Sequence, residues 1–335
     1  MNIVPFRFID EVLERLGVLD IKQIQELPPK SLWKEAADEF SEKFRPIYLD
    51  LVIGESSKLA FSCSGFKSDV TSLDLFFTMN PRYFKIQSVA ISDNYQYPRP
   101  LIDLPDPSRE RFLHVLGICL DQGNMGDLLV KVSKPASMNV LASIYKGLIG
   151  RAFFKRLTLI YAGVESQEFL EDQVNNNFRL SDVNVDSSRI TEATHWPEST
   201  IPILVKAMLN PKIQVVVAKP FVLDFEIYDQ VVQAWMANGT IRKCLSSDLK
   251  SIPETLPDYY IQRSSPRYGI SYALLVRHPT IKDYWLTWEI STGKFPKPAI
   301  RVMEFQDIRC KCKENLREHD SECALFRRGI RERNF

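Results

Sequence analysis

The sequence lacks an excess of charge of either sign, and it lacks long hydrophobic runs. Its 43 Lys and Arg residues nearly balance its 42 Asp and Glu residues, which leaves a formal charge of +1 over 335 residues. No overall field therefore attracts nucleic acid or an anionic membrane. A run of about 18 apolar residues, the length that spans a bilayer, does not occur. Charges at Arg7, Asp10 and Glu11 also interrupt the first apolar stretch, so we expect neither a membrane span nor a secretory signal.

Recognisable catalytic motifs are missing as well. The four histidines lie far apart, at positions 114, 195, 278 and 319, and none belongs to an HExxH motif. The sequence contains no G-x-S-x-G elbow, and the stretch 123–126 lacks the Lys-Ser/Thr pair that completes a phosphate-binding loop. We therefore expect a protein that is not an enzyme.

Cysteine is sparse, with six residues in the chain. Cys63, Cys119 and Cys244 stand alone in the sequence, which is typical of reduced thiols rather than of a disulfide framework. We therefore expect a cytoplasmic or nuclear protein. With 45% hydrophobic residues, the chain can bury a sizeable core in one large or two medium domains.

Residues 1–45 carry apolar side chains at helical spacing and predict three short helices. The first begins after Pro5, and its apolar stripe contains Phe8, Ile9, Val12, Leu13 and Leu16. Asp20 and Ser31 are suitable N-caps for the second and third helices, and Pro28-Pro29 separates the two. Three helices of this size bury little apolar surface alone. The segment is therefore either a docking element or a cap over the rest of the chain.

The same segment resembles the F-box, the helical motif through which substrate adaptors dock on cullin–RING ubiquitin ligases. The resemblance rests on the order Pro5, Ile9, Val12-Leu13, Leu16, Leu19-Asp20-Ile21, Ile24, Leu27 and Trp33. The opening VPFRFIDEVLERL also resembles the divergent F-box-like openings of nematode-expanded protein families. The resemblance implies binding to a Skp-type ligase adaptor. It implies that the partner-docking residues are Pro5, Ile9, Val12, Leu13, Leu16 and Trp33.

Residues 46–107 change to the period of strands. Apolar runs over 47–53, 59–63, 73–77 and 84–91, separated by turn residues, predict a short antiparallel meander. The stretch 94–107 is rich in Pro, Tyr and Asp, which predicts a linker.

Residues 108–300 predict a mixed α/β module. Strand-like motifs begin at Phe154, Leu180, Asn210 and Ile241, and helix-like stretches lie between them. A strand and a helix roughly every 26 to 31 residues are typical of leucine-rich-repeat architecture. An ordinary α/β sheet with right-handed crossovers gives the same signal. We expect irregular, leucine-rich-repeat-like strands rather than a true horseshoe.

Two further features of this module bear on its function. The β-prone runs 268–276 and 285–290 predict a C-terminal hairpin, with Trp288 and Ile290 on one face. The run FKRLTLIYAGVESQEFLEDQVNNNFRLSDVNVD resembles the F-box-associated segments of the same nematode families. That resemblance implies recognition of a protein substrate.

The last segment, residues 301–335, predicts a basic tail that contains a Cys/His cluster. Four ligands within 14 residues, enough for a tetrahedral zinc site, are Cys310, Cys312, His319 and Cys323. The single residue between the first two cysteines is a shorter spacing than zinc sites normally use. Reduced thiols on a solvent-facing terminal helix are the alternative interpretation.

Together these patterns predict an α+β chain with a three-helix F-box-like unit at 1–45, a meander and linker at 46–107, an α/β module at 108–300 and a tail at 301–335. The resemblance implies a substrate-recognition adaptor of a cullin–RING ubiquitin ligase that binds a protein target through its α/β module. The alternative is a non-catalytic scaffold whose N-terminal helices only cap its own core, with or without a C-terminal zinc site. A terminal zinc module that binds nucleic acid is a third hypothesis.

Overall fold

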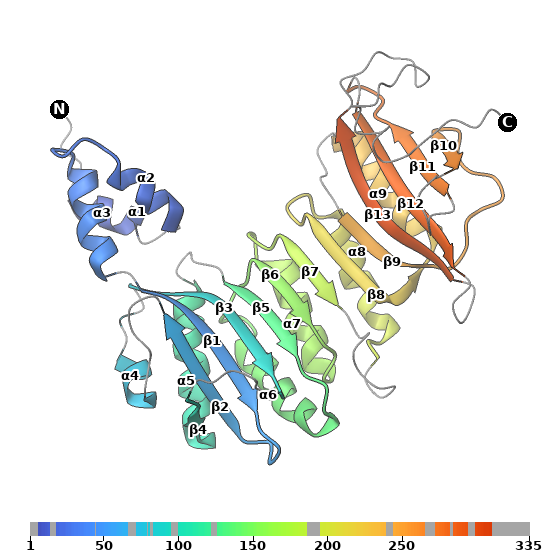
Figure 1. Cartoon of the computed structure of the whole chain (residues 1–335). Helices are drawn as coiled ribbons and strands as arrows, with labels where there is room; N and C mark the ends of the chain where they lie inside the picture. The colour runs from blue at the N-terminus through green and yellow to red at the C-terminus, as the bar shows by residue number, and fades with distance from the viewer. Residues whose placement is uncertain are drawn as a thin grey trace. The chain divides into compact units, whose positions relative to one another are not determined.

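The computed structural model describes residues 6–13, 18–43, 45–65, 72–78, 80, 83–94, 100–121, 126–185, 195–238, 244–264, 272–281, 284–293 and 299–309. These residues form a mixed α/β structure that divides into two compact units (Figure 1). Unit 1 contains residues 1–180 and 190–194, and unit 2 contains 181–189 and 195–335. None of the described helices has the length and hydropathy needed to cross a bilayer.

Unit 1 begins with a helical unit made of α1 (Phe6–Leu13), α2 (Val18–Gln25) and α3 (Leu32–Lys43). Its core consists of side chains that the three helices turn toward one another: Ile9, Leu13, Ile21, Ala36, Ala37 and Phe40. A turn joins α2 to α3, and in it the Ser31 N–H donates to the Pro28 carbonyl over 2.9 Å. The two prolines stop α2 here because they prevent its continuation as a helix.

The sheet of unit 1 has the strand order β4-β2-β1-β3-β5-β6. Its strands are β1 (Arg45–Ile53), β2 (Leu59–Gly65), β3 (Phe84–Ser92), β4 (Ile102–Leu104), β5 (Asp127–Lys131) and β6 (Arg156–Leu159). The run β1-β3-β5-β6 is parallel, whereas β2 and β4 are antiparallel to their neighbours. Along the parallel run, each strand therefore lies beside the next parallel strand in the chain.

Three helices cover one face of this sheet, and Figure 1 shows all of them behind the strands: α5 (Asp106–Asp121), α6 (Met138–Leu148) and α7 (Val164–Asn176). A short 3₁₀ turn, η1 (Pro135–Ser137), leads into α6. The strands alternate accordingly: in β5, Leu128 and Val130 are buried while Leu129 between them is half-buried. Such alternation is what a sheet with one packed face produces.

A buried polar cluster fastens α7 to the loop that precedes β6. The Gln173 side chain is fully buried; its Nε2 donates to the Ala152 carbonyl over 2.8 Å, and its Oε1 accepts the Phe154 N–H over 3.1 Å. Asn177 donates to the Phe154 carbonyl and accepts the Arg179 N–H. The two amides thus satisfy backbone groups that would otherwise be buried without partners.

Unit 2 continues with β7 (Asp182–Val185), η2 (Glu198–Thr200), α8 (Ile201–Leu209), β8 (Val215–Leu223), α9 (Phe225–Asn238) and β9 (Cys244–Leu249). It ends in β10 (Tyr260–Ser264), β11 (Tyr272–Arg277), β12 (Tyr284–Gly293) and β13 (Ala299–Arg309). The strand order is β7-β8-β9-β13-β12-β11-β10, parallel up to β9 and antiparallel from there on. Aromatic rings of Phe225, Tyr228 and Tyr260 surround the fully buried Trp288 at centroid distances of 5.1 to 5.6 Å.

The structure differs from the expected meander and linker in 46–107. Residues Leu73–Thr78 form helix α4 instead of a strand, because Ser72 Oγ caps the Leu75 N–H and Phe76 stacks on Phe112 of α5 at 4.6 Å. With a helix in the connection, β3 runs parallel to β1 rather than antiparallel. The expected linker contains β4, which pairs with β2.

The C-terminal hairpin is present as β11 and β12, and Trp288 and Ile290 are both buried. The expectation that everything after residue 300 is a tail was wrong, since 299–309 form β13 between β12 and β9. The strand-like motifs at 154 and 180 coincide with β6 and β7. Those at 210 and 241 lie just before β8 and β9.

Candidate docking surfaces

The structure places the expected docking residues in different environments. Ile9 and Leu13 are fully buried in the core of the helical unit. Val12 and Trp33 are half-buried. Pro5 and Leu16 lie outside the described residues. Ile9 and Leu13 therefore offer no surface to a partner, and any part they take in docking is to hold the helices together.

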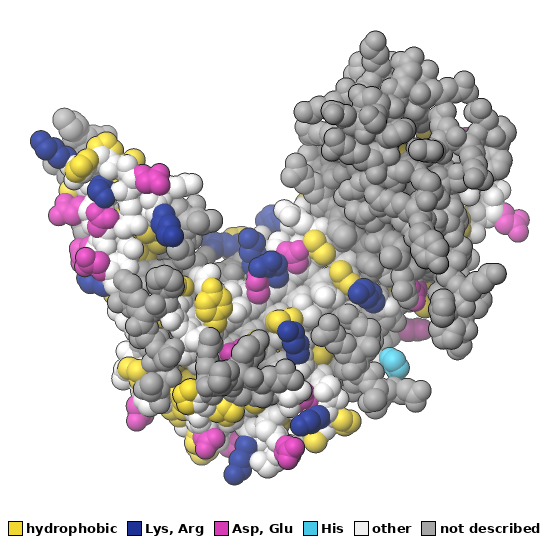
Figure 2. Space-filling view, in the orientation of Figure 1, with side chains coloured by type: hydrophobic (Ala, Val, Ile, Leu, Met, Phe, Trp, Pro, Cys, Tyr) yellow, Lys and Arg dark blue, Asp and Glu magenta, His cyan; other side chains and the backbone are white. Residues whose placement is uncertain are grey.

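Other apolar side chains of the helical unit are exposed. Phe8 is 52% exposed, Leu32 47% and Leu27 40%. The Phe8 ring meets Trp33 edge-on, with 6.5 Å between the ring centroids. Leu27 and Leu32 stand at the two ends of the turn between α2 and α3. We call Phe8, Leu27, Leu32 and Trp33 the helical apolar surface, and Figure 2 shows hydrophobic side chains on the outside of this unit.

Polar contacts fix the helices that carry this surface. Lys34 Nζ lies 3.1 Å from Asp38 Oδ2 and 2.8 Å from the Gln25 carbonyl. The Gln25 side chain donates to Asp38 Oδ1 over 3.0 Å, so the end of α2 is tied to α3. The hydrogen bond from Lys34, followed by that from Gln25, holds the pKa of Asp38 below its ordinary value. The network therefore holds the end of α2 against α3, next to the exposed Leu27 and Leu32.

A second surface is the face of the unit 1 sheet opposite α5, α6 and α7, which we call the open strand face. In one row across it, Tyr48 pairs with Ser88, Ser88 with Asp127 and Asp127 with Arg156. The Tyr48 side chain is 52% exposed. The Arg156 guanidinium donates two hydrogen bonds to the Asp127 carboxylate, and the one from Nε is 2.8 Å long. Figure 2 views this face, where acidic, basic and apolar side chains are mixed.

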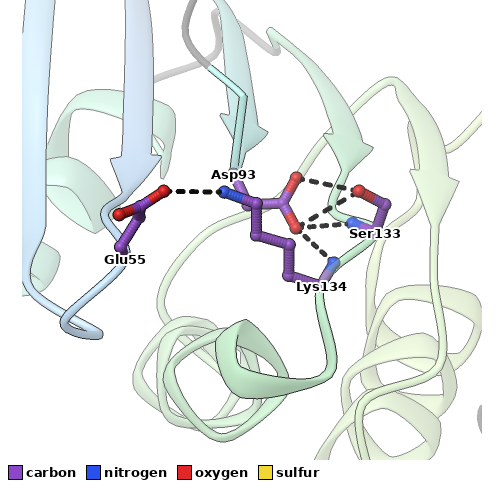
Figure 3. A network of polar contacts seen from close by, with 4 residues as sticks. All are labelled: Glu55, Asp93, Ser133 and Lys134. Carbon is purple, nitrogen blue, oxygen red and sulfur yellow. Dashed lines mark hydrogen bonds and ion pairs between the residues drawn. The ribbon is translucent and has the colours of Figure 1, made fainter.

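The carboxyl ends of the parallel strands hold a polar network (Figure 3). Asp93 follows β3 and is 5% exposed. Its carboxylate accepts the backbone N–H groups of Ser133, over 2.7 Å, and of Lys134, together with the Ser133 hydroxyl. Lys134 Nζ in turn lies 3.9 Å from the exposed Glu55 carboxylate. Three donors from the residues just before η1 therefore hold the Asp93 carboxylate, and this network fastens the start of the η1–α6 segment to the end of β3.

Among the described residues, no three His, Cys, Asp or Glu side chains gather as they would around a metal ion. The expected zinc ligands Cys310, Cys312, His319 and Cys323 all lie outside the described residues. The buried His278 accepts the Ile281 N–H at Nδ1 over 2.9 Å and so closes a turn.

The sequence did not distinguish the exposed members of the apolar stripe from the buried ones. Phe8 and Ile9 are adjacent, and both belong to the predicted stripe, yet one is exposed and the other is buried. One signal in the sequence was the width of the apolar stripe, which has two adjacent apolar residues at each of two successive turns. A stripe of that width is wider than one packing contact covers, so part of it is expected to be exposed.

No family model, no curated protein and no solved structure matches this chain. The functional hypotheses therefore depend on the helical apolar surface, on the open strand face and on the resemblance of the sequence to the F-box.

Proposed function

We propose that this chain is a non-catalytic substrate-recognition adaptor of a cullin–RING ubiquitin ligase, acting in the cytoplasm or nucleus. In this proposal the helical unit is F-box-like and docks on a Skp-type ligase adaptor. The α/β module holds a protein target, and the identity of that target is open. The resemblance of the first 45 residues to the F-box supplies the partner class.

The observation that carries the proposal is that the helical unit has a core of its own and still exposes apolar side chains. A segment that only capped the sheet would turn its apolar stripe toward the sheet. Ile9 and Leu13 instead pack with residues of α2 and α3, while Phe8, Leu27 and Leu32 remain exposed. Exposed aromatic and aliphatic side chains grouped on one small element are typical of a protein-binding surface.

For the target we propose the open strand face. We interpret the parallel strands β5 and β6, which are followed by α6 and α7, as an irregular leucine-rich-repeat-like arrangement. In repeat folds of this kind the exposed strand face is a usual binding surface. Support comes from Tyr48 and the half-buried Leu129 on this face, which stand among small and charged side chains.

The docking half of the proposal is tested by binding to a recombinant Skp-type adaptor in a pull-down and by calorimetry. Because Leu13 is a core residue, the informative variant is Phe8→Asp with Leu32→Asp, which changes the surface and spares the core. We expect binding by the wild type and a loss of at least about tenfold in affinity in the double variant. The matched control is Leu75→Asp, an equally exposed leucine at 45% outside the helical unit. No binding by the wild type, or equal binding by all three proteins, contradicts the proposal.

One contact favours the alternative, a scaffold whose helices serve its own fold. Tyr83, which precedes β3, packs against the core of the helical unit. In that case removal of the helices destabilises the sheet and no ligase adaptor binds.

A C-terminal structural zinc site would fit either function. Metal analysis of the purified protein, compared with a Cys310→Ser and Cys323→Ser variant, tests that site, and the absence of stoichiometric zinc excludes it.

A further inference from the structure

We infer that Tyr83 is a positioning residue that fixes the helical unit to the sheet of unit 1. Its ring lies against Phe40 of α3, with 5.7 Å between centroids and 55° between ring planes. Lys43 Nζ lies 5.6 Å from the centroid of the Tyr83 ring. Phe40 is 2% exposed and belongs to the core of the helical unit, so the tyrosine contacts a core residue.

The second attachment is covalent and lies next to the first. Helix α3 ends at Lys43 and β1 begins at Arg45, so one residue separates them. Arg45 pairs with Phe84, the residue that follows Tyr83. The ring contact from Tyr83, just before the neighbouring strand β3, adds a second point of attachment and opposes rotation of α3 relative to the sheet.

Backbone geometry holds Tyr83 itself in place. Its N–H donates to the Asn80 carbonyl over 3.0 Å, in a turn just before β3. Phe84, also bonded to the Asn80 carbonyl, then enters the ladder with β1. The ring is therefore presented from the end of a paired strand, so its contact with Phe40 and Lys43 transmits the orientation of the sheet to α3.

This joint would set the orientation between the helical apolar surface and the open strand face, a consequence that rests on the proposed function. A ligase adaptor must hold its target at a defined place relative to the ligase, because the reacting groups have to meet. The joint itself is independent of any partner, since all of its contacts are within this chain.

The test is a distance distribution between spin labels in the full chain. Labels on genetically encoded keto amino acids at Glu35 of α3 and Lys131 of β5, both exposed, leave the native cysteines unchanged. We expect one narrow distribution for the wild type and for Tyr83→Phe, which keeps the ring. For Tyr83→Ala we expect a distribution at least about twice as broad, because a joint that lacks the ring permits independent motion.

Amide hydrogen exchange of α3 separates a lost joint from a lost fold. Slow exchange in Tyr83→Ala together with a broad distance distribution supports the joint. An unchanged distribution in Tyr83→Ala overturns it. Exchange in α3 as fast as in the core variant Leu13→Ala also overturns it, because Tyr83 would then only stabilise the helices. Failure of the wild type to bind a Skp-type adaptor removes the proposed function and leaves this result standing.

Discussion

At the scale of single residues, adjacent apolar side chains of the helical unit have separate roles. Ile9 and Leu13 have no exposed surface, whereas Phe8 and Leu32 are about half exposed. Substitutions in the two groups should therefore have different signatures. A change in the first group acts on the stability of the helices, whereas a change in the second group tests the proposed docking.

Replacing Leu13 by Ala should destabilise the helical unit by about 2–5 kcal/mol, the usual range for a leucine removed from a closed core. Leu32→Ala should change stability by no more than about 0.5 kcal/mol, because that side chain is exposed. Amide hydrogen exchange of α3 measures both effects locally. Equal protection in the two variants would show that Leu13 is not a core residue.

A second prediction at the residue scale concerns how the contribution of Tyr259 to stability depends on pH. Its hydroxyl donates to Asp229 Oδ1 over 2.6 Å and accepts from the Gln233 side chain. Desolvation, then the hydrogen bond to Asp229 and its negative charge, raise the pKa of Tyr259 to about 12. Because this folded-state pKa lies above the unfolded value of about 10, the stabilisation is complete below pH about 10 and is lost as the pH rises through about 12.

Asp229→Asn should therefore move the titration of Tyr259 toward pH 10. The measurement is the absorbance at the phenolate band, taken as the difference between each protein and the same protein carrying Tyr259→Phe. A midpoint that does not move in Asp229→Asn would assign the raised pKa to burial alone.

At the scale of elements, the close approach of β5 to β3 depends on a glycine. A Cβ at Gly126 would lie 2.7 Å from the Ile86 carbonyl oxygen, which belongs to the backbone of β3 and cannot turn away. Gly126→Ala should therefore destabilise the protein by about 1–3 kcal/mol. At Gly147 of α6 the nearest atom is the Leu113 Cδ1, the end of a side chain that can rotate. The shift in melting temperature should be larger for Gly126→Ala, and the reverse order would contradict this account.

The helices of the sheet modules were predictable because apolar residues recur at helical spacing within each of them. Residues 135–148, for example, form η1 and α6, and Leu141, Ile144 and Leu148, which recur at helical spacing, are fully buried. Strand direction was not predictable in the same way. The direction of β3 depends on whether residues 73–77, between β2 and β3, form another strand or a helix. This short apolar run fits a helix and a strand equally well.

The candidate surfaces were only partly predictable for a related reason. Spacing identified the stripe of α1, but which side chains are covered depends on how α2 and α3 pack on it, which is a tertiary property. The open strand face was even harder to predict from the sequence. The register of the strands brings together residues about 40 positions apart, such as Asp50 beside Ala90 and Ala90 beside Leu129.

At the scale of the whole molecule, the separate core of the helical unit leads to different predictions for the proposed adaptor and for the scaffold alternative. Deletion of residues 1–43 should leave the remaining chain folded, with a melting temperature within a few degrees of the wild type. The reason is that the deleted helices contribute a core of their own and touch the sheet module at Tyr83. Circular dichroism and calorimetry of the shortened protein measure this, and loss of its cooperative transition would favour the scaffold.

The parallel strands of each unit lie side by side in the order in which they are synthesised. Such an arrangement can lengthen by tandem duplication, because an added strand and helix inserted between β5 and β6 would extend the sheet without rerouting any other connection. A variant with one such added strand and helix would have a wider open strand face, while its N-terminal helices would be unchanged.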